Sequence, residues 1–117
     1  MHNYLELRVY KEAIDFTADV YKFVTDFPPY ERYGLSNQLR RAAVSVPSNI
    51  AEGCGRSTDK DTARFVSISI GSLFEIDTQL RLSKKFDYGE PAQLLDRLIR
   101  LRKQLIAFHR HLRGTGK

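Results

Sequence analysis

The chain has 117 residues, of which 42% are hydrophobic and 28% charged, and its net charge is +5. This size and balance predict one globular domain over residues 1–117, large enough to bury a core without disulfides or metal ions. Cys54 is the only cysteine, which excludes an intrachain disulfide, and no apolar run is long enough for a signal peptide or a membrane span. We therefore expect a cytoplasmic protein with no membrane contact.

Apolar residues spaced three and four apart predict a first helix over about 8–27 and a second over about 36–54. The two prolines Pro28 and Pro29 are expected to end the first helix, because a residue before proline disfavours helical geometry. Ser36 is the expected N-cap of the second helix.

Pro47 lies inside the second predicted helix, where it has no N–H to donate to the Ala43 carbonyl. We expect a kink at this position. Ser45, Ser48 and Asn49 are the candidates to satisfy the freed carbonyl or a nearby backbone group. The small residues around the proline predict a narrow, closely packed helix and not a catalytic loop.

The same spacing predicts a third helix over about 58–86 and a fourth over about 91–113. Thr58 followed by Asp61 resembles a capping box, and Pro91 suits a first helical turn. No segment alternates as a strand does. Short connections between long helices favour antiparallel neighbours, so we expect an all-α, antiparallel up-down-up-down four-helix bundle.

The first and third helices each carry a second, mixed apolar stripe beside the core stripe. An amphipathic helix in a monomeric bundle needs only one such stripe, so the second predicts contact with another subunit. The alternative is that wide stripes fill a larger core. The candidate interface residues are Tyr10, Ile14 and Tyr21 on the first helix, and Leu82 and Phe86 on the third.

Residues 38–56, QLRRAAVSVPSNIAEGCGR, closely resemble the signature of the 23S rRNA intervening-sequence protein family, also called S23-type proteins. The segments LRVYKEAIDF, FPPYERYGLSNQLRRA and FVSISIGSLFEIDTQL match it as well. The resemblance implies a compact antiparallel bundle that assembles as a homopentamer. It also implies kinship with accessory proteins of diversity-generating retroelements, which bind nucleic acid and associate with a reverse transcriptase. RNA or DNA, a reverse transcriptase or another protein are the partners it suggests.

We assign a structural role to five residues of this signature: Arg40, Arg41, Pro47, Asn49 and Glu52. The adjacent arginines point in different directions on a helix. One is expected to pair with Glu52, Glu75 or Glu31, inside the bundle or between subunits, because arginine suits bidentate pairs. The other is free to face solvent and meet phosphate.

The positive charge is concentrated at the C-terminal end, where residues 97–117 include seven basic and no acidic side chains. On a helical projection the basic residues fall outside the arc of core leucines. This pattern predicts contact with polyanions through the backbone, without sequence reading. The alternative is a solvated helix end whose charge suits the helix dipole. The candidate nucleic-acid-binding residues are Arg100, Arg102, Lys103, Arg110 and Arg113.

No arrangement typical of an enzyme is visible. Cys54 has no base beside it in sequence, and His109 and His111 are two apart, so they cannot ligate a metal from one helix face. We expect no catalytic residue, cofactor or metal. The chain is predicted to be a non-enzymatic, oligomeric nucleic-acid-binding scaffold; the alternative is a protein-interaction scaffold whose basic face meets an acidic partner.

Overall fold

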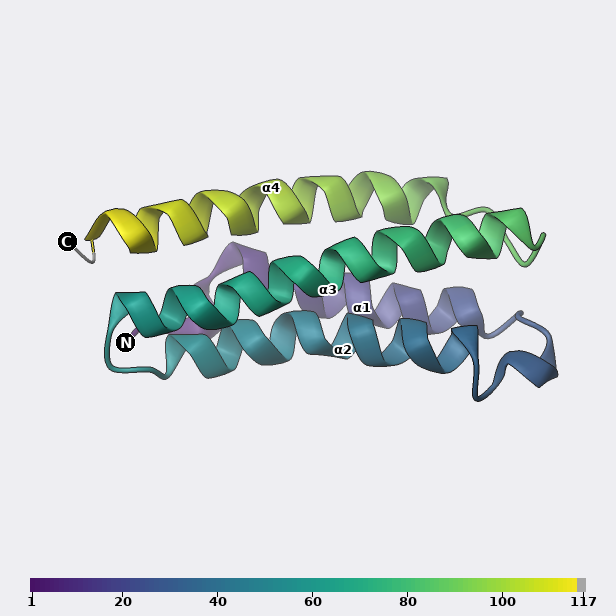
Figure 1. Ribbon diagram of the computed structural model, residues 1–117, viewed down its shortest axis with the longest axis horizontal. Coiled ribbons are helices and arrows are strands. Elements are labelled where there is room, and N and C mark those ends of the chain that lie inside the picture. The colour runs from purple at the N-terminus through teal and green to yellow at the C-terminus, as the bar shows by residue number, and fades with distance from the viewer. Residues whose placement is uncertain (116–117) are drawn as a thin grey trace.

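The computed structural model describes residues 1–115 and confirms the predicted all-α four-helix bundle (Figure 1). The bundle is elongated, with extents of 48 × 21 × 20 Å. The helices are α1 (Arg8–Val24), α2 (Leu35–Cys54), α3 (Asp59–Lys85) and α4 (Ala92–Thr115), with short 3-10 turns at Tyr4–Glu6 and Pro29–Glu31. None of the helices in this part of the chain is long and apolar enough to cross a membrane.

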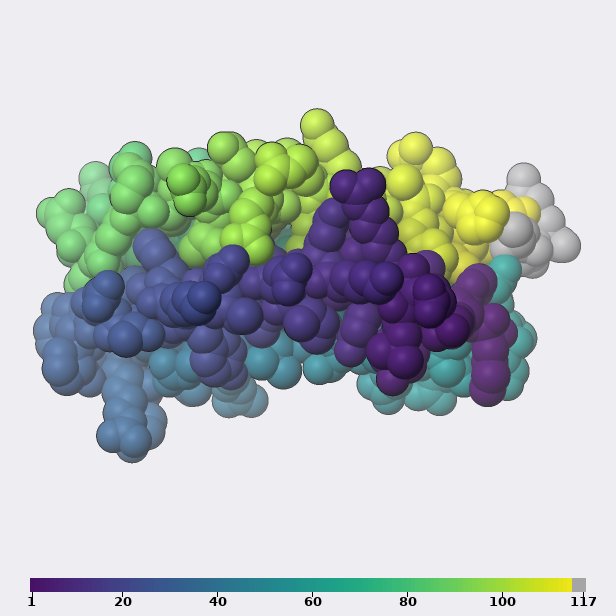
Figure 2. Space-filling model, turned by 180° about the vertical axis from the view of Figure 1, so that it is seen from behind, coloured from purple at the N-terminus to yellow at the C-terminus, as the bar shows by residue number. Residues whose placement is uncertain are grey.

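Successive helices run in opposite directions, and each packs on two neighbours. α2 contacts α1 and α3, and α4 contacts α3 and α1, so the four helices close into a ring. Figure 2 shows α1 and α4 side by side over one face of the molecule. This antiparallel order places the start of α3 beside the end of α4, at the same end of the bundle as both termini (Figure 1).

The core consists of the apolar stripes that the sequence predicts. All four helices contribute side chains that are almost fully buried, and burial of each is worth roughly 1.5–3 kcal/mol. The largest fully buried side chains include Phe16, Val20, Leu39, Val46, Ile50, Val66, Leu73, Ile76, Leu80, Leu98, Leu105 and Leu112.

Two predicted helix ends differ from the structure. α1 ends at Val24, three residues before the predicted end, and Phe27 leaves the helix while its ring stays buried in the core. Ser36 is not the N-cap of α2; it is buried inside the first turn. The Glu31 carboxylate takes the capping role instead, because its Oε1 accepts the Leu35 N–H at 3.0 Å.

Tyr88, in the loop between α3 and α4, bonds the same carboxylate, and Tyr30, the residue before Glu31, bonds Tyr88. Tyr88 donates its hydroxyl hydrogen to Glu31 Oε2 at 2.7 Å, so Tyr30, 3.2 Å away, must be the donor to the Tyr88 oxygen. The Leu35 N–H, followed by the Tyr88 hydroxyl, lowers the pKa of Glu31. Hydrogen bonds with Tyr30 and Glu31 raise the pKa of Tyr88. The two loops are thereby joined at the end of the bundle away from the termini.

α3 begins and ends with well-formed caps. The predicted N-cap is confirmed, because Thr58 Oγ1 accepts the Asp61 N–H at 3.1 Å. At the other end Asp87 adopts φ 61°, a left-handed conformation usually given to glycine. The Tyr88 N–H then reaches the Ser83 carbonyl at 2.9 Å and the Asp87 N–H reaches the Lys84 carbonyl at 3.0 Å. This pair of backbone hydrogen bonds is a Schellman motif with aspartate in the position usually taken by glycine.

α2 continues through Pro47 as one helix, and a neighbouring helix satisfies the carbonyl that the proline frees. Thr17 Oγ1 of α1 lies 3.0 Å from the Ala43 oxygen and 2.8 Å from the Ala13 oxygen. The Ala13 carbonyl already has an intrahelical partner available, whereas Pro47 cannot supply one to Ala43. The hydroxyl hydrogen is therefore most needed at Ala43. A kink at Pro47 stays a prediction.

The side chains predicted to help satisfy the freed Ala43 carbonyl do not bond to it, but the predicted alternative, a bond to a nearby backbone group, is confirmed for Asn49. Asn49 donates to the Ser45 carbonyl at 2.9 Å and to the Ser45 hydroxyl at 3.0 Å. The Ser45 hydroxyl lies 2.8 Å from the Ser72 hydroxyl of α3, and Ser48 is exposed. These side chains look towards α3 or solvent, while the proline faces the core.

Two more hydroxyl groups of α3 donate to backbone carbonyls of α2. Ser69 Oγ reaches the Val46 oxygen at 2.8 Å, and Thr62 Oγ1 reaches the Gly53 oxygen at 2.8 Å. The helices are close enough at Gly53 that a Cβ there would lie 2.7 Å from the Cβ of Phe65. The expectation of a narrow, closely packed α2 is therefore confirmed.

Candidate nucleic-acid interface

Four of the five predicted basic residues lie on the solvent side of α4. Arg100, Lys103, Arg110 and Arg113 are exposed, and none of them forms an ion pair with another residue in the described range 1–115. The leucines of the same helix point the other way, into the core. The charges on these four side chains are therefore available to an external partner.

Arg102 differs from the other four because it is held within the bundle. Its Nη1 lies 3.1 Å from Asp77 Oδ2 of α3, and its guanidinium carbon is 4.6 Å from the centre of the Phe74 ring. Only 19% of its side chain is exposed. The expectation that Arg102 shares the free basic face was wrong: it connects α4 to α3.

The contact with Arg102 also favours the charged form of Asp77. Burial raises the pKa of Asp77, but hydrogen bonds from Arg81 and Arg102 together outweigh burial and lower it below the ordinary 3.8. A carboxylate with two arginine donors strongly favours its charged form. Arg102 is thus committed to Asp77 in the folded chain.

Arg97 connects α4 to the opposite neighbour, α1. Its Nη1 lies 2.6 Å from Asp19 Oδ2, and its hydrogen bond lowers the pKa of that carboxyl group. Two of the seven basic residues at the C-terminal end therefore position α4 between its neighbours. Lys117, a third, lies outside the described residues.

Nearby acidic side chains reduce the net positive charge of the surface around Arg100. This residue lines a hollow of about 310 Å³ between α1 and α4 that also includes Glu12, Asp15 and Arg8. Glu12 is engaged there, by Arg8 at 2.9 Å and by the Gln104 amide at 2.8 Å. Unopposed charge is therefore greater towards the C-terminal half of α4.

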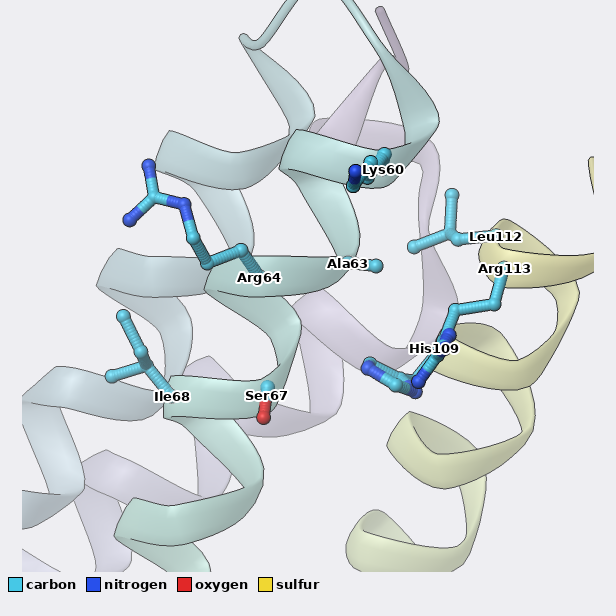
Figure 3. Close-up of a pocket in the computed structure, with 8 residues that line it drawn as sticks. All are labelled: Lys60, Ala63, Arg64, Ser67, Ile68, His109, Leu112 and Arg113. Atoms are coloured by element: carbon cyan, nitrogen blue, oxygen red, sulfur yellow. The ribbon is translucent and has the colours of Figure 1, made fainter. Parts of the chain in front are cut away.

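A second hollow, of about 630 Å³, lies between the start of α3 and the end of α4. Three of its lining residues were not predicted as site residues: the cations Lys60 and Arg64 of α3, and the imidazole of His109 on α4. They join Arg113, and no carboxylate is among the eight residues that line this hollow (Figure 3). Lys60 and Arg64 are four residues apart and so lie on one face of α3. Together with the predicted antiparallel bundle, which places the start of α3 beside the end of α4, this spacing could have indicated a basic site.

The chain's other reactive groups form no site in the described residues. Cys54 is fully buried, and burial raises the pKa of its thiol, so a reactive thiolate is disfavoured. Over the described residues, no three His, Cys, Asp or Glu side chains gather to hold a metal ion. His2 contacts Asp59 at 2.9 Å, which secures the N-terminal segment to the start of α3.

The sequence profile of the 23S rRNA-intervening sequence proteins matches residues 5–107. The chain belongs to the 23S rRNA-intervening sequence protein family. The fold is also similar to the crystal structure of a protein of unknown function from the S23 ribosomal protein family of Bacteroides thetaiotaomicron. The TM-score is 0.76 at 20% identity, with 86% of this chain and 97% of that chain covered. No curated protein matches the chain.

Arg40 and Glu52 of the family signature form contacts within the fold, although not the predicted ones. Arg40 donates to the Arg32 carbonyl at 3.2 Å, and Glu52 pairs with Arg56 at 3.3 Å. Arg41 is exposed and forms no ion pair among residues 1–115. The expected pairing of either arginine with a carboxylate is therefore wrong within the single chain, and pairing between subunits stays a prediction.

The candidate interface residues of this family member are mostly open to solvent. Ile14 and Tyr21 of α1 are each 44% exposed, Leu82 of α3 is 40% exposed, and Phe86, which directly follows α3, is 50% exposed. Tyr10 is half-buried instead and packs edge-on against Tyr4, with 5.0 Å between ring centroids. Four exposed apolar side chains are thus available for contact with a second copy.

Proposed function

We propose that this protein is a non-enzymatic, homo-oligomeric scaffold that binds the backbone of nucleic acids through α4. The observation that carries the proposal is the set of four exposed cations, Arg100, Lys103, Arg110 and Arg113, without acidic partners in the described chain. Arg102 is left out of the contact set because Asp77 holds it.

The expected mode of binding is electrostatic. Lysine and arginine side chains that neutralise phosphates release counterions, so affinity falls steeply with salt and depends little on base sequence. The exposed arginines can also form bidentate contacts with phosphate oxygens. The sequence shows no recognition-helix or RNA-binding motif, which agrees with backbone contact.

Assembly as a pentamer, which the family resemblance implies, would multiply this weak contact. A closed ring of five requires a heterologous interface, in which two different patches of the same chain meet. The exposed apolar residues of α1, Ile14 and Tyr21, and those at the end of α3, Leu82 and Phe86, supply two such patches. Five copies of the α4 surface would then bind one strand with avidity.

The test is the triple variant Arg100→Glu, Lys103→Glu and Arg110→Glu, assayed by fluorescence anisotropy with RNA and duplex DNA. For duplex DNA, we expect the slope of log affinity against log salt to fall by about 2 to 3, since each lost contact removes about 0.9. Affinity should fall similarly for unrelated sequences. Far-ultraviolet circular dichroism and light scattering establish that the variant folds and keeps its assembly mass.

A matched control reverses the same number of charges elsewhere, at Lys11, Arg32 and Lys85, which are exposed. Equal loss of binding in both variants would show that net charge, and not the α4 surface, determines affinity. If the parent protein binds neither RNA nor DNA at low salt, the remaining proposal is a scaffold for an acidic protein. A reverse-transcriptase partner stays a prediction.

A further inference from the structure

The hollow between α3 and α4 combines cations with an apolar wall. Lys60 and Arg113 approach it from the two helices, with His109 beside Arg113 (Figure 3). Ala63 and Leu112 form part of its wall. Such a mixture suits a ligand with an anionic group next to a flat, largely apolar one.

The cations that face this hollow are not neutralised within the described chain. Neither Lys60 nor Arg113 forms an ion pair among residues 1–115. Arg64 is different: it pairs with Asp61 at 3.0 Å, stacks 4.5 Å from the Phe65 ring centre, and points away from His109 and Arg113 in Figure 3. Lys60 and Arg113 are therefore the available phosphate ligands.

The volume of about 630 Å³ lies within the range of roughly 300–1,000 Å³ that is typical of sites for small organic groups. Ile68, 44% exposed, adds apolar surface at the edge of the hollow, and the Ser67 hydroxyl supplies a polar contact. One nucleotide has the required combination of phosphate and base. A base that is paired and stacked inside a duplex cannot rotate outwards to contact such a wall, whereas a base of a single strand can.

An aromatic surface continues the side of α3 on which Ser67 lies. Phe74 is 54% exposed and follows Ser67 by seven residues, or roughly 10 Å along the helix. The Arg102 guanidinium lies over its ring at 4.6 Å. Exposed aromatic rings and arginine planes are the surfaces on which bases of single strands stack. Phe74 is therefore placed to receive a neighbouring base.

We propose that the α3/α4 hollow binds single-stranded nucleic acid, with a phosphate on Lys60 and Arg113 and a base against Phe74. This inference rests on the proposed function and makes it more specific. It predicts that the protein prefers single strands to duplexes, which a purely electrostatic α4 surface would not do, because a duplex carries the higher charge density.

The experiment compares a 20-nucleotide oligouridine with a 20-base-pair duplex by fluorescence anisotropy at fixed salt. Phe74→Ala leaves the net charge unchanged. We expect it to weaken oligouridine binding about 5- to 150-fold, the range for loss of one stacked base, and to leave duplex binding unchanged. Lys60→Ala with Arg113→Ala should weaken oligouridine binding at least about 10-fold more than the control Lys11→Ala with Lys85→Ala.

Three results would overturn the proposal that the hollow binds single strands. The first is equal affinity of the parent protein for oligouridine and duplex, and the second is an equal effect of Phe74→Ala on both affinities. The third is an affinity of the Lys60 and Arg113 variant that equals that of the control variant. Displacement of oligouridine by polyglutamate at equal charge would assign the hollow to acidic proteins instead. If Phe74→Ala does not fold, the Lys60 and Arg113 variant decides. The α4 triple variant separates the two proposals. If it loses binding while the Phe74 variant and the Lys60 and Arg113 variant keep it, only the proposal for the hollow is refuted.

Discussion

Two glycines in helices of this bundle predict opposite effects of the same substitution. An added Cβ at Gly53 would lie 2.7 Å from Phe65 Cβ and 3.1 Å from the Thr62 carbonyl oxygen, both fixed to the backbone of α3. Overpacking costs about 1–3 kcal/mol, and loss of the Thr62 hydrogen bond about 1 more, against a gain of about 1 from helix propensity. Gly53→Ala should therefore lower the free energy of unfolding by about 1–3 kcal/mol.

Gly71 is the matched control, since an added Cβ there meets nothing within 4 Å. Gly71→Ala in the middle of α3 should raise the free energy of unfolding by about 1 kcal/mol, the difference in helix propensity. Urea unfolding followed by circular dichroism, at one protein concentration for all variants, measures both changes. A Gly53→Ala protein as stable as the parent would refute the close approach of α2 and α3.

Three further substitutions test single contacts. Thr17→Val should lower the free energy of unfolding by about 1–3 kcal/mol, because the Ala43 carbonyl loses its donor; a change no larger than that of the exposed Thr25→Val in urea unfolding would contradict this. Asp77→Asn should lower the free energy of unfolding at pH 7. The difference in stability between parent and variant should shrink as pH falls below 3.8, because the lowered pKa favours the folded state only while the parent carboxylate is charged. A pH-independent difference in thermal unfolding would argue against the arginine contacts. Asp87→Gly should raise the free energy of unfolding by up to about 1 kcal/mol, and with it the thermal midpoint, since glycine adopts φ 61° without strain. An unchanged or lower thermal midpoint would count against the Schellman cap.

Apolar periodicity was enough to predict the helices and their buried faces. Spacings of three and four place Val9, Ala13, Phe16 and Val20 on one side of α1, and all four are buried. Thr58 was also predictable as a cap, because its bond to the Asp61 N–H is local in sequence. The Thr58 cap and the buried stripes depend on residues within one or two helical turns, which a sequence displays directly.

Two of the predictions that failed concern partners that are distant in the chain. Arg102 has no acid near it in sequence, and its partner Asp77 comes from another helix. Similarly, the donor to Ala43 is 26 residues away, on α1. Helical projection shows which way a side chain points but not which charge on the next helix it meets. The free cations could therefore be separated from Arg102 only with the packed bundle in view.

The hydroxyl-to-carbonyl bond from Thr17 to α2 has a consequence for the choice among alternative packings. Apolar stripes that repeat every turn allow one helix to slide along another by about 5 Å with similar burial. The bond from Thr17 to the Ala43 carbonyl fits one axial position only, because Pro47 frees this carbonyl in the middle of α2. Sliding would leave the Ala43 carbonyl without its donor, and an unsatisfied buried group costs about 1–3 kcal/mol. One proline and one hydroxyl side chain thus select a single register from a set that the leucines alone would leave nearly equal.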